Sequence, residues 1–304
     1  MKKTSTRETI KIGESQMPIF DNETAFNTLP PKPDFVLPGI KPGQVGTIIS
    51  PGGVGKSALA LQLCASVVGG PDPLEIAKHV PDSKAVFIAL EDSYEDIHHR
   101  FKTLQHIATP EQAECLKDRE KFTIYPWAEE SVDVMCEGPR NALKHVAKGA
   151  RLLIIDTLVL AHTMDENDNN KMSQVINVFK SIATENNCAI IYLHHVTKGG
   201  KGDGQELARG AGAIVNNARW QAYIRLMSDD EAKEHNVKKD AQGEYPFLKF
   251  GVAKQNSGKK MKPVWMTRKS NDNPDILGYT LHKAEIEKPK TITKKEKEND
   301  GFDL

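Results

Sequence analysis

Residues 50–57 read SPGGVGKS, a run whose residue types suit the binding of a phosphate chain. Its glycines let the backbone wrap an anion with N–H groups, the Lys56 ammonium reaches the terminal phosphates, and the Ser57 hydroxyl binds Mg²⁺. The apolar run before the loop predicts a strand and the stretch ALALQLCASVV after it predicts a helix, whose positive end would point at the phosphates. The usual pattern begins with Gly, where this chain has Ser50. We expect nucleotide contacts from Pro51, Gly52, Gly53, Val54, Gly55, Lys56 and Ser57.

Two acidic residues end apolar runs at places that would lie near this loop. Residues 152–156 read LLIID, so the Asp156 carboxylate would emerge at the carboxyl edge of the sheet and order Mg²⁺ through water. Glu91 follows the apolar run 85–90 and could accept a proton from, or orient, the water that attacks a γ-phosphate. Many kinases with a phosphate loop carry a substrate-binding acid at this position instead, so position alone leaves both roles open.

Further candidates for phosphate chemistry come later in the chain. His194 and His195 end the apolar run CAIIYL and precede the Gly-rich, cation-bearing loop TKGGKGDGQELARG. An imidazole at a strand end can contact a γ-phosphate and relay its presence to the next loop. A cation placed on the transferring phosphoryl group raises turnover by about 10³ to 10⁵. The candidates for that cation are Arg219, Arg209 and Lys254.

The elements that must position these residues follow an alternating pattern. Short apolar runs alternate with longer amphipathic segments as far as residue 193, which predicts an α/β fold with a mostly parallel central sheet. Strands are expected at 45–50, 85–90, 152–156 and 189–193, and helices from 55, from 93, at 139–148 and at 171–185. Later strands, expected at 220–227, 247–253, 264–266 and 279–281, have no long helix between them, so they predict an antiparallel C-terminal extension.

Length and composition limit the class of protein. The chain has 304 residues, of which 38% are hydrophobic and 27% charged, as expected for one globular domain. We expect an N-terminal arm at 1–32, the α/β domain at 33–283 and a charged tail at 284–304. Because 41 basic residues balance 41 acidic ones, any nucleic-acid site must be local. No apolar run approaches the roughly 20 residues of a membrane helix, and no apolar run follows the charged N-terminus, so we expect a cytoplasmic protein with no membrane contact.

Together, these residues resemble one family, the RecA-like hexameric replicative DNA helicases of broad-host-range plasmids, the RepA type. The resemblance covers about residues 33–270 and rests on five ordered segments: VLPGIKPGQVGTIISPGGVGKSALALQL, LEDSYEDIHHR, RLLIIDTL, IIYLHHVTKG and NNARW. The Ser-Pro-Gly-Gly opening of the phosphate loop also occurs in this family, which accounts for Ser50. The resemblance implies a RecA-like P-loop NTPase fold that binds ATP and Mg²⁺ between neighbouring subunits of a homohexamer.

The resemblance also implies roles within one subunit. Lys56 and Ser57 would bind phosphate and Mg²⁺, and Asp156 would organise the Mg²⁺. Glu91 would be the catalytic carboxylate, and His195 would sense the γ-phosphate.

Other implied roles cross from one subunit to the next. Arg219 of the adjacent subunit would be the arginine finger, with Lys254 as a second trans-acting candidate. Arg100 would contact the nucleotide.

The implied DNA site is a pair of loops around 163–172 and 198–210 that face the central channel of the ring. The first loop, TMDENDNNK, is acidic, whereas a phosphate backbone prefers cations. Binding of single-stranded DNA would therefore depend on Lys198, Lys201 and Arg209 of the second loop. The six copies of this loop in a hexamer would add avidity.

The implied function is ATP-dependent translocation on single-stranded DNA and duplex unwinding in plasmid replication, with other plasmid replication proteins as partners. Two alternatives stay open. One is a non-motor RecA-like ATPase, a regulator or recombination mediator with the same site. The other is a P-loop kinase for a small molecule, which predicts a monomer with no trans-acting finger.

Overall fold

The computed structural model describes residues 9–12, 15–77, 79–128, 130, 132–196 and 212–286. The chain divides into two units, Met1–Asp34 and Phe35–Leu304. The candidate site residues all belong to the second unit.

The first unit contains little regular structure in its described part. β1 (Thr9–Ile12) and β2 (Ser15–Pro18) pair as antiparallel strands. The short helix α1 (Asn22–Asn27) follows, and Asp21 caps it by accepting a hydrogen bond from the Thr24 N–H. No residue of α1 is buried, so this helix contributes nothing to a core of its own unit.

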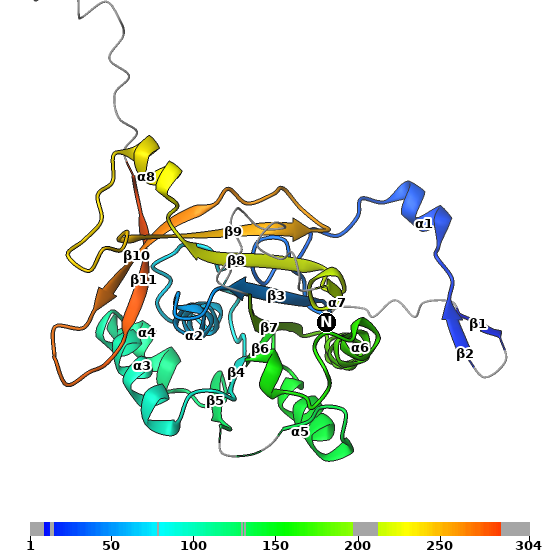
Figure 1. The fold of residues 1–304 in the computed structure, drawn as a ribbon. Coiled ribbons are helices and arrows are strands. Elements are labelled where there is room, and N and C mark those ends of the chain that lie inside the picture. Colours follow the sequence, from blue (N-terminus) through cyan, green and yellow to red (C-terminus); the bar gives the residue numbers. More distant parts are fainter. Residues whose placement is uncertain are drawn as a thin grey trace, which may run out of the picture. The chain divides into compact units, whose positions relative to one another are not determined.

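The second unit is built on a sheet that has nine strands in the described residues (Figure 1). In chain order they are β3 (Val45–Ser50), β4 (Ala85–Ala89), β5 (Phe122–Pro126), β6 (Leu152–Asp156), β7 (Ala189–His195), β8 (Trp220–Leu226), β9 (Phe247–Gln255), β10 (Val264–Ser270) and β11 (Tyr279–Ala284). Their order in space is β11-β10-β9-β8-β3-β7-β6-β4-β5. Pairing is parallel from β5 to β8 and antiparallel from β8 to β11. The expected parallel sheet with an antiparallel extension is confirmed.

Several helices of this unit begin at a capping side chain. In chain order, the helices are α2 (Lys56–Val67), α3 (Tyr94–His106), α4 (Pro110–Lys117), α5 (Glu137–Ala147), α6 (Asn169–Asn186), α7 (Gly212–Asn216) and α8 (Asp229–His235), with a 3₁₀ turn, η1, at Leu158–Leu160. The hydroxyls of Ser93, Thr109 and Ser228 cap α3, α4 and α8, and each helix returns a side-chain acceptor to its cap residue. Such reciprocal caps satisfy backbone donors that would otherwise lack partners.

Two apolar layers cover the two faces of the sheet. Along β6, Leu152 and Ile154 pack in the layer that contains α2, whereas Leu153 and Ile155 pack in the layer that contains α5 and α6. The side chains of β6 alternate between the two layers because successive side chains of a strand point to opposite faces of the sheet. Because both faces are covered, β3, β4 and β6 are buried along their whole length, which explains their continuous apolar sequences.

None of the helices in the described part of the chain combines the length and the apolar composition that a bilayer crossing requires.

Candidate active site

The loop between β3 and α2 has the backbone conformation that phosphate binding requires. Gly53 has a φ of +77° and Gly55 a φ of +111°, left-handed values that glycine adopts without strain. Gly55 is also the N-cap of α2, and no side chain caps that helix. The N–H groups of the first turn are therefore available to an anion, which the helix dipole favours.

Two residues of the antiparallel extension flank this loop, and the sequence analysis missed both. A Cβ atom on Gly55 would lie 2.7 Å from the Tyr279 hydroxyl oxygen, so any other residue here would displace Tyr279 in addition to straining the backbone. Arg268 donates from Nη2 to the Val54 carbonyl at 3.2 Å. The central carbon of its guanidinium lies 5.3 Å from the centre of the Tyr279 ring. An aromatic ring and a cation thus stand beside the loop.

Gln62 holds this extension against α2. Its Nε2 donates to the Leu281 carbonyl at 2.7 Å, and its Oε1 accepts from the Leu281 N–H at 3.0 Å. Both bonds are buried, where losing them is costly. A lone amide within the apolar stretch ALALQLCASVV is the one sequence signal that could have indicated a specific partner here.

Lys56, the first residue of α2, is buried and lies against His195. Its Nζ is 3.1 Å from Nδ1 and 3.3 Å from Nε2 of the imidazole, of which only one can accept a hydrogen bond. The same Nε2 lies 3.6 Å from Oε2 of Glu91. Burial lowers the pKa of Lys56, and the Asp156 and Glu91 carboxylates oppose that shift. The structure therefore brings together four of the residues expected to act in one subunit.

Asp156, the last residue of β6, is 1% exposed. Burial raises the pKa of this carboxyl to about 6, although the nearby Ser57 hydroxyl lowers it. Neither carboxylate oxygen makes a well-formed hydrogen bond within the described residues. Buried oxygens without partners cost free energy unless a ligand satisfies them. A carboxylate beside a hydroxyl is the kind of oxygen donor set that Mg²⁺ prefers, so these residues fit the expected metal.

Arg100 is engaged by a neighbouring acid. Its Nε lies 2.9 Å from Oδ2 of Asp92, and its Nη2 donates to Oδ1 of the same carboxylate at 3.0 Å. Asp92 lies close enough to Asp156 to raise the pKa of that residue further. Arg100 is thus linked to Asp156 through Asp92, and its contact with a nucleotide stays a prediction.

Arg219 and Lys254 lie at the opposite edge of the sheet from the phosphate loop. The Arg219 N–H donates to the carbonyl of Val45, the first residue of β3, at 3.0 Å. The five steps along β3 to the loop, at about 3.3 Å each, separate the two edges by roughly 17 Å. Lys254 pairs with Gln221 near Arg219, and its Nζ donates to the Asn216 carbonyl at 2.9 Å.

Lys180 of α6 brings a third cation to this edge. Burial lowers the pKa of Lys180, and the charges of Arg219 and Lys254 lower it further, so the three side chains are neighbours. Within the described residues, none of the three forms an ion pair with a carboxylate. A group of like charges with no acid beside it favours an anion from elsewhere.

The residues expected to bind DNA are described only in part. Lys198, Lys201 and Arg209 lie outside the described residues, so their role stays a prediction. The acidic loop 163–172 is described, and its Asp168 caps α6 by accepting two backbone N–H groups at 2.9 and 3.2 Å. The Asp168 carboxylate therefore stabilises the start of α6.

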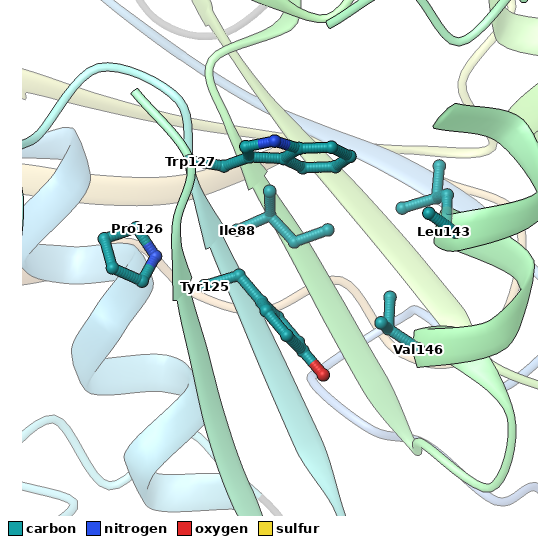
Figure 2. A pocket seen from close by; sticks show the side chains of 7 residues that line it. Ile88, Tyr125, Pro126, Trp127, Leu143 and Val146 are labelled. Carbon is teal, nitrogen blue, oxygen red and sulfur yellow. The ribbon is translucent and has the colours of Figure 1, made fainter. Parts of the chain in front are cut away.

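An apolar hollow of about 270 Å³ lies beside β5, apart from the phosphate loop. Figure 2 shows Tyr125 and Trp127 on one side of it and Leu143 and Val146 of α5 on the other. Its lining residues are Ile88, Tyr125, Pro126, Trp127, Ala142, Leu143 and Val146. Since none of them is charged, the hollow does not suit a phosphate group.

Comparisons with known proteins bear on the family and the fold of this chain. The family model described as an AAA domain matches residues 14–201. A solved ATPase domain matches with a TM-score of 0.51 and 17% identity, over 75% of this chain and 82% of that one. A DnaB-like replicative helicase, solved with its primase interactions, matches with a TM-score of 0.51 and 18% identity, over 75% of this chain and 55% of that one. This chain thus spans about half the length of that helicase, and the likenesses show a RecA-like fold.

Proposed function

This chain belongs to the AAA domain family, and on that premise we propose that it is an ATP-dependent DNA helicase. It works as a homohexamer that hydrolyses ATP at subunit interfaces, moves along single-stranded DNA and separates duplex strands in plasmid replication. One observation carries the proposal: Lys56, Glu91, Asp156 and His195 converge beside a loop whose backbone N–H groups are open to an anion.

The phosphate loop and Lys56 bind the phosphate chain of ATP. The first-turn N–H groups of α2 donate to phosphate oxygens, and the Lys56 ammonium reaches the terminal phosphates from the base of the pocket. Tyr279 and Arg268, which flank the loop, offer an aromatic face and a guanidinium to the base or sugar.

Ser57 and Asp156 hold Mg²⁺, which neutralises charge on the phosphates when it is bound. Occupation of this position would satisfy the two buried Asp156 oxygens. It would also hold the carboxyl in its ionised form, against the raised pKa that burial imposes.

Glu91 orients the attacking water and accepts its proton. Its side chain is about half exposed, and its carboxylate lies beside the imidazole of His195. Burial and the Lys56 charge lower the pKa of His195, which favours the neutral imidazole. A neutral ring can donate one hydrogen bond to a γ-phosphate and accept another from Lys56.

The cations at the opposite edge support assembly into a ring. Roughly 17 Å separates Arg219 from the loop of its own chain, too far for an arginine side chain to bridge. Arg219, Lys254 and Lys180 would instead meet the phosphates of a neighbouring subunit. Trans-acting cations of this kind require the oligomer for full turnover.

The DNA part of the proposal rests on the sequence resemblance to plasmid helicases and on the RecA-like fold. One of the solved structures with this fold is a replicative helicase. Because the charge of the chain is balanced, we expect the DNA to be bound by local loops, and residues 198–210 carry cations that suit this role.

The test compares hydrolysis with and without single-stranded DNA, and unwinding of a forked duplex, for the wild type and Lys56→Ala. We expect DNA to change the hydrolysis rate, the fork to be unwound, and both activities to vanish in the variant. Hydrolysis that DNA leaves unchanged, without unwinding, would point to a non-motor ATPase. A monomer that phosphorylates a small acceptor would point to a kinase.

A further inference from the structure

The end of β7 faces two regions at once. Successive side chains of a strand point to opposite faces, so His195 and His194 are directed apart. His195 contacts Lys56 and Glu91 at the phosphate loop. His194 is buried, and its Nδ1 lies 3.8 Å from Oε1 of Glu166, in the segment between η1 and α6. One strand end thus touches both the nucleotide site and this segment.

The acidic residues of this segment either approach the end of β7 or serve the segment's own turns. Asp165 Oδ1 accepts the Asn167 N–H at 2.9 Å, and Asp168 caps α6. Glu166 alone among these three acids is directed at the strand end. The acidity of TMDENDNNK, which looks unsuited to DNA, is therefore accounted for by local structure and by this one contact.

Two polar side chains near His194 have a buried atom without a hydrogen-bond partner in the described residues. His162 accepts the Met164 N–H at Nδ1, so its proton is on Nε2, and that buried donor has no partner within the described residues. The buried Oε1 of Glu166 likewise lacks a hydrogen bond. Burial lowers the pKa of His194, and the nearby His162 lowers it further. Buried polar groups with no partner are costly, so a rearrangement that pairs them would be favourable.

The 3.8 Å between His194 Nδ1 and Glu166 Oε1 is only slightly longer than a hydrogen bond. A hydrogen bond from an imidazole N–H to a carboxylate spans 2.7 to 3.2 Å. A shift of about 1 Å at the end of β7 would therefore join His194 to Glu166. Contact between His195 and a γ-phosphate would act on the adjacent residue of the same strand.

We propose that Glu166 and His194 form a coupling contact that transmits the nucleotide state sensed by His195 to residues 162–168. Glu166 is a positioning residue: it touches neither nucleotide nor Mg²⁺, and it sets the conformation of the segment that leads into α6. The inference rests on the proposed function, because it requires ATP at the phosphate loop. It assigns to the acidic segment a response to nucleotide, in place of a grip on DNA phosphates.

Amide hydrogen exchange of the full-length protein tests this contact. Exchange at 162–168 is measured with Mg²⁺ and either ADP or the non-hydrolysable analogue AMP-PNP, for the wild type and Glu166→Ala. We expect AMP-PNP to slow exchange in the wild type by about fivefold or more relative to ADP, and to have no such effect in the variant. The double variant Glu166→Ala, His194→Gln should show the same loss of the AMP-PNP effect on exchange as Glu166→Ala alone, because both substitutions remove the same contact.

Asp165→Asn is the matched control, since it removes one negative charge from the same segment without touching His194. It should respond to AMP-PNP as the wild type does. Calorimetry on each protein shows whether nucleotide is bound. If AMP-PNP binds but exchange at 162–168 does not respond, or responds equally in Glu166→Ala, the coupling contact is refuted alone. The coupling contact would also be refuted if Asp165→Asn lost the AMP-PNP effect on exchange as fully as Glu166→Ala does. Absence of binding to the wild type would instead refute the proposed function.

Discussion

The Asp156→Asn substitution should stabilise the nucleotide-free protein at neutral pH while it abolishes ATP hydrolysis. Asp156 is buried, and burial raises its pKa to about 6 from an ordinary value of 3.8. An acid whose pKa is raised on folding binds its proton more tightly in the native state, so its ionisation opposes folding. This opposition is absent below about pH 4, grows between the two pKa values, and is complete above about pH 6.

The magnitude follows from the two pKa values. A difference of about two units, at about 1.36 kcal/mol per unit, corresponds to about 3 kcal/mol of lost stability at pH 7.5. At pH 5 the same relation leaves about half of that cost. Asparagine has nearly the same shape and carries no charge, so the variant should be more stable than the wild type by an amount that grows between these pH values.

Denaturant unfolding at pH 5 and pH 7.5 measures this difference. The change with pH isolates the charge, because any hydrogen bond that asparagine itself makes contributes equally at both values. Asp230→Asn, which removes a carboxylate that is almost fully exposed, should stay within about 0.5 kcal/mol of the wild type at both. An advantage of Asp156→Asn that is the same at both pH values, or that shrinks as pH rises, would refute the reasoning.

The remaining predictions concern the loop and the opposite edge of the sheet. Gly55→Ala should destabilise the protein by about 1–3 kcal/mol in thermal unfolding, because a left-handed residue gains a Cβ that meets the Tyr279 hydroxyl; an unchanged melting temperature would contradict the observed packing. Tyr279→Ala should weaken nucleotide binding about tenfold in a titration with Mg·ATP while the protein stays folded, and unchanged affinity would remove Tyr279 from the site. Arg219→Ala should lose hydrolysis by about 10³-fold or more, and mixing it with Lys56→Ala subunits should restore turnover at junctions where both intact halves meet. No recovery on mixing would place Arg219 outside the neighbour's site.

The sequence predicted well the buried strands that position the candidate site. β3, β4, β6 and β7 lie in the interior of the sheet, so their apolar runs and the polar residues at their carboxyl ends were readable. Because parallel strands end at one edge, Glu91, Asp156 and His195 could be expected near Lys56. The distances place His195 against Lys56 and Glu91 against His195, and the Asp156 charge acts on the pKa of Lys56.

The sequence analysis missed two elements that bury few of their residues, β5 and α4. β5 is an edge strand that is half exposed, and it ends in Pro126, which cannot donate to a further strand. Its sequence FTIYP therefore lacks the continuous apolar run of an interior strand. The eight-residue helix α4 was also missed, because only one of its residues is buried.

The flanking residues Arg268 and Tyr279 could not be predicted for a different reason. Arg268 bonds to the loop across 214 positions of sequence, and no local motif records such a contact. The Gln62 amide that aligns β11 with α2 spans 219 positions. Likewise, sequence alone cannot show that Glu166 lies close to His194, since that depends on how the segment enters α6.

Calorimetric titration of the full-length protein with Mg·ATP tests the central claim most directly, because every proposed role depends on a nucleotide at the loop between β3 and α2. We predict saturable binding to the wild type and an affinity at least about tenfold weaker for Lys56→Ala, which loses the buried ammonium at the base of the pocket. Absence of binding to the wild type at millimolar Mg·ATP, or equal affinity of the two proteins, would contradict the account.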